Sequence, residues 1–141
     1  NNDLVLDGVP LYGGSAGSYL MTGGTGCLRR TVPAGGSTYY PVGTTSSFAP
    51  ATLNLDASST TDAYRVRVNS GVSTTYDAND APSGTPITNA ALQHTWFVRD
   101  VVSGGTNASL LLQWNAQDEA PGFTRNACRI ARIFRNAITI R

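Results

Sequence analysis

The sequence predicts an all-β protein, and three features point to this class. Residues that favour helices are scarce apart from alanine, with one Glu, one Met and no Lys in 141 residues. Thr, Ser, Gly, Val and Tyr, which favour strands and turns, are abundant. Short stretches alternate apolar and polar residues, and glycine pairs separate them. We therefore expect an antiparallel β-sandwich, immunoglobulin-like or jelly-roll-like, with about 8 to 10 short strands.

The clearest strands are Ala51–Asp56 and Ala63–Asn69, in which apolar residues recur at every second position. The second stretch alternates an apolar row, expected in the core, with arginines expected in solvent: Tyr64, Val66 and Val68 against Arg65 and Arg67. Apolar patterning and turn-rich boundaries predict further strands at Asp3–Leu6, Tyr19–Thr22, Leu28–Val32, Thr38–Pro41, Thr95–Val101, Ser109–Trp114, Cys128–Phe134 and Ala137–Ile140.

Turn-forming residues separate the strands within one expected domain, residues 1–141. Glycine pairs such as Gly13-Gly14 suit hairpins, because glycine adopts positive φ at little cost. The segment from Ser73 to Asn89 is rich in Pro, Asp, Asn and Thr, and we interpret it as a long crossover between sheets. Asn126–Phe134 also fits a short helix, although a strand is the preferred interpretation.

Charge and hydropathy exclude several classes of partner. Ten Arg against nine acidic residues give a formal net charge of +1. This balance provides no field to attract nucleic acid, so we expect no nucleic-acid partner. No apolar run approaches the ~20 residues that cross a bilayer, so we expect no membrane insertion. Only 13% of the residues are charged and hydroxyl and amide side chains are common, as in many extracellular proteins.

Several phrases of the sequence occur together in one kind of domain. They are Gly24-Thr-Gly with Arg29-Arg-Thr-Val-Pro-Ala-Gly-Gly, Tyr40-Pro-Val-Gly-Thr, Tyr76-Asp-Ala-Asn, Thr95-Trp, and Leu112-Gln-Trp-Asn-Ala-Gln-Asp-Glu-Ala-Pro-Gly-Phe. In this combination the chain, from about Asn2 to Cys128, resembles a β-domain of large secreted and cell-surface proteins of the Bacteroidota. The residues after Cys128 depart from the aromatic-rich strands usual in that family.

The resemblance implies export through the type IX secretion system and an extracellular or cell-surface location. In such proteins the module follows adhesin-like repeats. The resemblance defines a module rather than an activity, and it brings no catalytic residues to this chain.

Cys27 and Cys128 are the two cysteines of the chain, an even number that suits an oxidising, exported setting. A disulfide between them would join the two ends of the domain and, through chain entropy, stabilise it by up to about 4.7 kcal/mol. Two buried free thiols are the alternative, because the sequence does not show whether the Cα atoms approach each other closely enough.

Two features resemble catalytic or zinc-binding groups, but each has a simpler explanation. Gly13-Gly-Ser15-Ala-Gly17 matches the nucleophile elbow of hydrolases, with His94 as the nominal base. The residues that follow Ser15 favour a strand instead of the required helix, so we expect a glycine-serine hairpin and no enzymatic activity. Because His94 has no partner at metal-ligand spacing, we interpret it as a histidine at the start of a strand, bonded to backbone.

Asp77, Asn79 and Asp80 are the candidate ligands for a calcium ion, the one cofactor that we consider. Calcium takes about six to eight oxygens, and this cluster does not supply a full set. An Asx-turn is the alternative. Asp118 and Glu119 form a second acidic pair, for which we expect a solvated loop or another Asx-turn.

Aromatic residues in the strands provide the candidate contact surface. Trp96 and Trp114 lie in apolar strands and favour core packing, whereas Phe97 points to the opposite face from Trp96. Apolar residues on both faces indicate contact with another element or another molecule. The residues that we predict for assembly contacts are Leu4, Leu6, Tyr39, Tyr40 and Phe97. The first strand either pairs within its own sheet or adds to a neighbouring subunit.

These observations predict a non-enzymatic extracellular structural or adhesive module, which associates with itself as a fibre subunit or with other surface proteins. Its mechanism would be apolar burial and backbone pairing at strand edges. The alternative is a carbohydrate-binding module of a secreted glycan-degrading system, with exposed aromatic rings near a calcium-stabilised loop.

Overall fold

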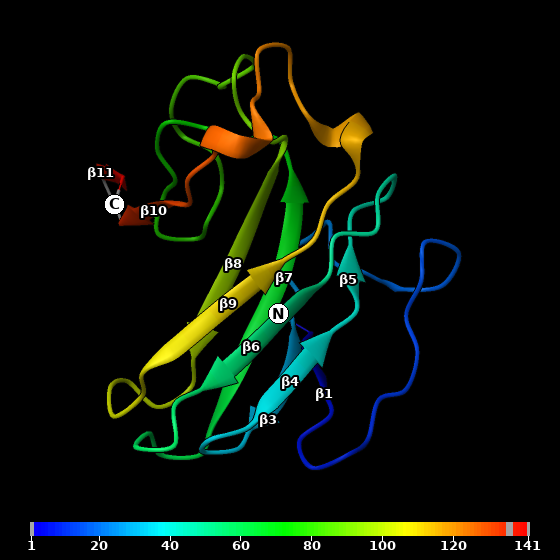
Figure 1. Cartoon of the computed structure of the whole chain (residues 1–141), viewed down its shortest axis with the longest axis vertical. Helices are drawn as coiled ribbons and strands as arrows, with labels where there is room; N and C mark the ends of the chain where they lie inside the picture. The colour runs from blue at the N-terminus through cyan, green and yellow to red at the C-terminus, as the bar shows by residue number, and fades with distance from the viewer. Residues whose placement is uncertain (1, 135–136, 141) are drawn as a thin grey trace. The chain divides into compact units, whose positions relative to one another are not determined.

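The computed structural model describes residues 2–134 and 137–140 (Figure 1). Its elements are β1 (Leu4–Val5), β2 (Leu20–Met21), β3 (Leu28–Val32), β4 (Ser37–Tyr40), β5 (Val42–Gly43), β6 (Ala51–Leu55), β7 (Asp62–Ser70), β8 (His94–Asp100), β9 (Ala108–Leu112), the 3-10 helices η1 (Ala116–Asp118) and η2 (Arg125–Ala127), β10 (Ala131–Phe134) and β11 (Ala137–Ile140). No α-helix occurs in this part of the chain. The predicted all-β class is therefore confirmed.

The strands form two larger sheets and two small pairs. The first sheet has the order β1-β3-β7-β8 and the second β4-β6-β9, while β2 pairs with β5 and β10 with β11. The pairs β3–β7, β4–β6, β6–β9 and β10–β11 are antiparallel. The pairs β1–β3 and β2–β5 are parallel. The expectation of a purely antiparallel arrangement is therefore wrong at β1 and β2.

All ten predicted strands correspond to observed strands, with different bounds at most ends. β3 occupies the predicted residues, Leu28–Val32. β5 was not predicted, because a strand of two residues, Val42–Gly43, is too short to show alternation. In Asn126–Phe134 the strand β10 begins only at Ala131, after the 3-10 turn η2.

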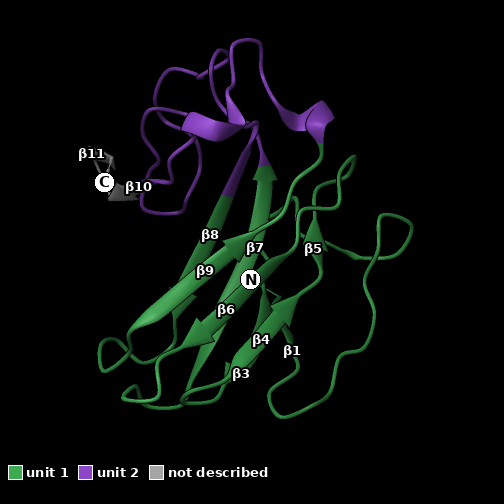
Figure 2. Cartoon of the chain, in the orientation of Figure 1, with its two compact units in different colours: residues 1–69, 96–115 green, residues 70–95, 116–141 purple. Residues whose placement is uncertain are grey.

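The chain divides into two compact units (Figure 2). Unit 1 contains residues 1–69 and 96–115, and unit 2 contains residues 70–95 and 116–141. The predicted crossover, residues 73–89, lies in unit 2 and joins β7 to β8. Because β7 and β8 are neighbours in one sheet, the segment does not cross between sheets, and that part of the prediction is wrong. The assignment of residues 1–141 to one domain stays a prediction.

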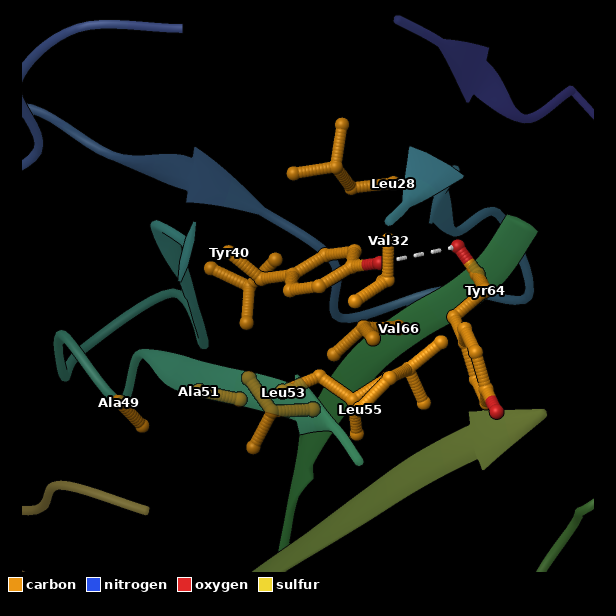
Figure 3. Packing of buried hydrophobic residues seen from close by; sticks show 11 residues of the cluster. Leu28, Val32, Tyr40, Ala49, Ala51, Leu53, Leu55, Tyr64 and Val66 are labelled. Carbon is orange, nitrogen blue, oxygen red and sulfur yellow. Dashed lines mark hydrogen bonds between the residues drawn. The ribbon is translucent and has the colours of Figure 1, made fainter. Parts of the chain in front are cut away.

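The core of unit 1 is an apolar cluster to which both larger sheets contribute (Figure 3). Its members are Leu28, Val32, Tyr40, Val42, Ala49, Ala51, Leu53, Leu55, Tyr64, Val66 and Val68. The apolar row predicted on β7 is confirmed, since Tyr64 is 5% exposed and Val66 and Val68 are 0% exposed. Each fully buried valine or leucine side chain stabilises the fold by about 1.5–3 kcal/mol.

The second face of β7 differs from the prediction at Arg67. Arg65 is exposed, as expected, but Arg67 is only 3% exposed. The Arg67 guanidinium carbon lies 3.8 Å from the centre of the Phe97 ring, and Nη1 donates a hydrogen bond to the Gly24 carbonyl at 3.1 Å. A cation over an aromatic face and a backbone acceptor compensate the burial of this charge.

Replacement of Tyr40 by Phe tests the polar contact in the core. The Tyr40 hydroxyl lies 3.2 Å from the Arg30 carbonyl oxygen and 3.5 Å from that of Tyr64, and it donates to them (Figure 3). Tyr40→Phe should lower the free energy of unfolding by about 1 kcal/mol, because the core loses a buried hydrogen bond. Urea denaturation measures this loss. Tyr39→Phe is the control and should change stability by less than about 0.5 kcal/mol; equal losses would contradict the assignment.

Candidate functional site

The five predicted contact residues do not form one surface. Tyr40 is 0% exposed, so it is a core residue and is not available to a second chain. Leu6 packs against the core cluster, and Phe97 lies under the Arg67 guanidinium. The remaining two belong to different sheets: Leu4, 45% exposed, lies in β1, and Tyr39 lies half-buried in β4.

The first strand pairs within its own sheet. The Leu4 amide donates to the Cys27 carbonyl and the Leu6 amide to the Arg29 carbonyl, both at 2.9 Å. Ion pairs flank this strand, with 3.0 Å between Asp3 and Arg65 and 2.9 Å between Asp7 and Arg29. Of the two arrangements that the sequence left open, the structure has the one within the chain.

Exposed apolar side chains remain on two edge strands. On β1 they are Leu4 and Val5, 45% and 51% exposed. On β9, the edge of the second sheet, Leu111 is 66% exposed. Val5 and Leu111 were not predicted as contact residues, although Leu111 is the middle residue of an apolar triplet whose period-two pattern places it on the opposite face from its partly buried neighbours. These edges are the candidate interaction surface.

The candidate calcium loop has the geometry of an Asx-turn. The Asp77 Oδ1 atom accepts hydrogen bonds from the amides of Asn79 at 2.8 Å and Ala81 at 2.9 Å. Asp80 has a φ of 65°, which the turn accommodates, and its amide donates to the Asp77 carbonyl at 3.1 Å. The Asp77 Oδ1 atom is therefore already engaged by hydrogen bonds within the loop. Among the described residues, no group of three or more His, Cys, Asp or Glu side chains is placed to hold a metal ion.

Asp118 and Glu119 each lie beside a His or Arg side chain, so the expectation of a solvated acidic loop is wrong. In unit 2 the Asp118 Oδ2 atom lies 3.2 Å from His94 Nε2, with side chains 9% and 3% exposed. This is an ion pair when the imidazole carries its second proton. Glu119 Oε1 lies 2.5 Å from Arg125 Nε. His94 begins β8, as predicted, but its neighbour is a carboxylate that sequence spacing did not indicate.

The segment around Ser15 is an exposed turn. Ser15 and Ser18 exchange backbone hydrogen bonds at 2.9 and 3.0 Å, and the Gly17 amide donates to Ser15 Oγ at 3.3 Å. The next regular element is the short strand β2, not a helix. The glycine-serine hairpin that we predicted is therefore confirmed.

Cys27 and Cys128 are free thiols, so the structure does not support the predicted disulfide. Cys27 is half-buried in unit 1, whereas Cys128 is exposed in unit 2. Burial, and after it the nearby Asp3 carboxylate, raise the pKa of the Cys27 thiol above its usual range. Trp96 has the predicted core role, since it packs against the core cluster and its Nε1 donates to the Ala49 carbonyl at 2.9 Å.

No family model, no curated protein and no solved structure matches this chain. No helix in the described residues is long and apolar enough to cross a membrane.

Neighbouring residues Asp118 and Glu119 allow a matched test of the buried pair. Asp118→Ala should lower the free energy of unfolding by about 1–3 kcal/mol, because it leaves a buried imidazole without its neighbouring carboxylate. Glu119→Ala should cost less than about 1 kcal/mol, since Arg125 is largely in water. Thermal and urea denaturation measure both losses. Equal losses would show that the His94–Asp118 contact stabilises the fold no more than the Glu119–Arg125 contact.

The two thiols should differ in reactivity. In the reduced protein at pH 8, a thiol-specific reagent should modify Cys128 faster than Cys27, because Cys27 is half-buried and its raised pKa keeps it protonated. Peptide mass mapping at successive times measures the order. Faster reaction of Cys27 would contradict it, and a thiol count of zero before reduction would restore the disulfide.

Proposed function

We propose that the chain is a non-enzymatic extracellular structural or adhesive module that associates with itself through its sheet edges. The observation that carries this proposal is the exposure of apolar side chains on edge strands, Leu4 and Val5 on β1 and Leu111 on β9. Edge strands present unpaired backbone groups, and monomeric proteins usually protect these groups from other chains. Apolar residues at such edges favour the addition of another strand.

The fold and location in this proposal rest on separate arguments. An apolar cluster shared by strands of the two larger sheets supports a β-sandwich. The resemblance to β-domains of secreted Bacteroidota proteins supports export and a cell-surface location. The low content of charged residues, 13%, is consistent with that setting.

A carbohydrate-binding module is the second candidate, and one observation favours it. A shallow depression between β6 and β9 is lined by amide, carboxylate and hydroxyl side chains, namely Asn54, Asp56, Asn107 and Ser109. Such groups can hydrogen-bond the hydroxyls of a sugar. The lining contains no aromatic ring on which a sugar would stack, so self-association is the better supported function.

The native size of the chain tests the proposed function. Light scattering over a concentration series, up to about 1 mM, should give a mass that rises above the 14.8 kDa of one chain. Electron microscopy then distinguishes small closed oligomers from fibres. A mass that remains at one chain throughout would contradict self-association, and binding to a glycan array by that monomer would support the second candidate.

A further inference from the structure

We infer that β9 pairs with β9 of a second copy of this chain, in antiparallel orientation and centred on Leu110. The inference rests on the proposed function, since it names the strand and the partner for self-association. Two observations carry it: the direction of the backbone groups along β9, and the differences between the four edges of the two larger sheets.

The backbone of β9 directs alternate residues away from β6. At the two ends of the ladder, the Asp56 amide donates to the Asn107 carbonyl at 2.9 Å and the Gln113 amide to the Pro50 carbonyl at 3.1 Å. In an antiparallel pair, hydrogen-bonded and non-hydrogen-bonded positions alternate. With the register Thr52↔Leu111 and Asn54↔Ser109, these two pairs are therefore the bonded positions within β9.

The intervening residues of β9, Ala108, Leu110 and Leu112, direct their N–H and C=O groups to the open edge of the sheet. In the described part of the chain no hydrogen bond reaches these groups. They form a regular row of donors and acceptors along the strand.

The other edges of the two larger sheets are less suited to strand pairing. On β4, the other edge of this sheet, the Tyr39 carbonyl accepts a hydrogen bond from Arg30 Nη1 at 2.6 Å. In the first sheet, β1 has only two residues, and β8 ends in the charged pair Arg99-Asp100. Side-chain cover, short length and charge are common means of blocking edge pairing. β9, Ala-Ser-Leu-Leu-Leu, has none of them, and it contains neither proline nor glycine.

A second copy of β9 complements this edge. Two-fold antiparallel pairing centred on Leu110 sets Leu110 opposite its own copy and Ala108 opposite Leu112 of the second copy. All three outward positions then become hydrogen-bonded pairs, with about six new backbone bonds. Since β9 carries no charge, no like charges meet across the two-fold axis.

The same register also covers exposed apolar surface. Leu111, 66% exposed, would lie beside Ser109 of the second copy and diagonally near the second Leu111. The sheet β4-β6-β9 would continue into that of the partner as one six-stranded sheet. A contact of one strand is small, so the association is weak and is best measured at high concentration.

Amide hydrogen exchange, measured residue by residue by NMR on the full chain at low and high concentration, tests the inference. At high concentration the amides of Ala108, Leu110 and Leu112 should exchange more slowly. The amides of Ser109 and Leu111 already bond β6, so they should change little and serve as controls within the same strand.

Variants add a second readout. Leu111→Lys should weaken association about tenfold or more, because it places like charges near each other across the axis. Met21→Lys is the matched control, at 67% exposure on β2, and should leave association unchanged. Leu4→Lys tests the β1 edge of the first sheet, and it should also leave self-association unchanged.

The outcomes separate this inference from the proposed function. Association without added protection of the β9 amides, or association lost in Leu4→Lys but kept in Leu111→Lys, would overturn the inference and leave self-association in place. Pairing through β9 that stops at a dimer, with no larger assembly, would support the inference but would contradict the proposed structural role. A chain that stays monomeric at every concentration would overturn both the inference and the proposed self-association.

Discussion

The alternating apolar faces of the central strands β6 and β7 are the constraint on which the rest of unit 1 depends. Val66 and Val68 are excluded from solvent, and a shift of one residue along β7 would place arginines in their positions. The register with β3 follows from this alignment, because Leu28 pairs with Val66 and both contribute to the same cluster. One periodic pattern thus fixes both the core and the pairing around it.

Central strands are paired on both sides, whereas the edge strands of the same sheet are paired on one side only. β6 has β4 on one side and β9 on the other, so the second sheet ends at these two strands. The Arg30 guanidinium covers part of the β4 edge, while the apolar triplet of β9 has no comparable cover in the described residues. The candidate contact surface therefore consists of edge residues that the core does not bury. Leu111, the most exposed leucine of β9, is not part of the core cluster.

Local patterns in the sequence predicted the strands well, because period-two alternation is a property of neighbouring residues. The direction of the β1–β3 pairing could not be predicted, since it depends on contacts between distant segments. Arg67 appeared as a solvent residue because the alternation takes no account of Phe97, whose ring receives the guanidinium from another strand. The proximity of His94 to Asp118 was equally hidden, because neither residue lies at a recognisable spacing from the other.

Unit 2 is held by polar contacts more than by an apolar core. Among its residues with described burial, Tyr76 and Ala120 are the buried apolar ones, and the Tyr76 hydroxyl lies 2.7 Å from Thr95 Oγ1. Segments with few buried apolar contacts open locally at lower free energy than a packed core. β9 and the strands that position it belong to unit 1. Because the row of backbone groups on β9 is fixed by its ladder with β6, local opening within unit 2 leaves that ladder intact.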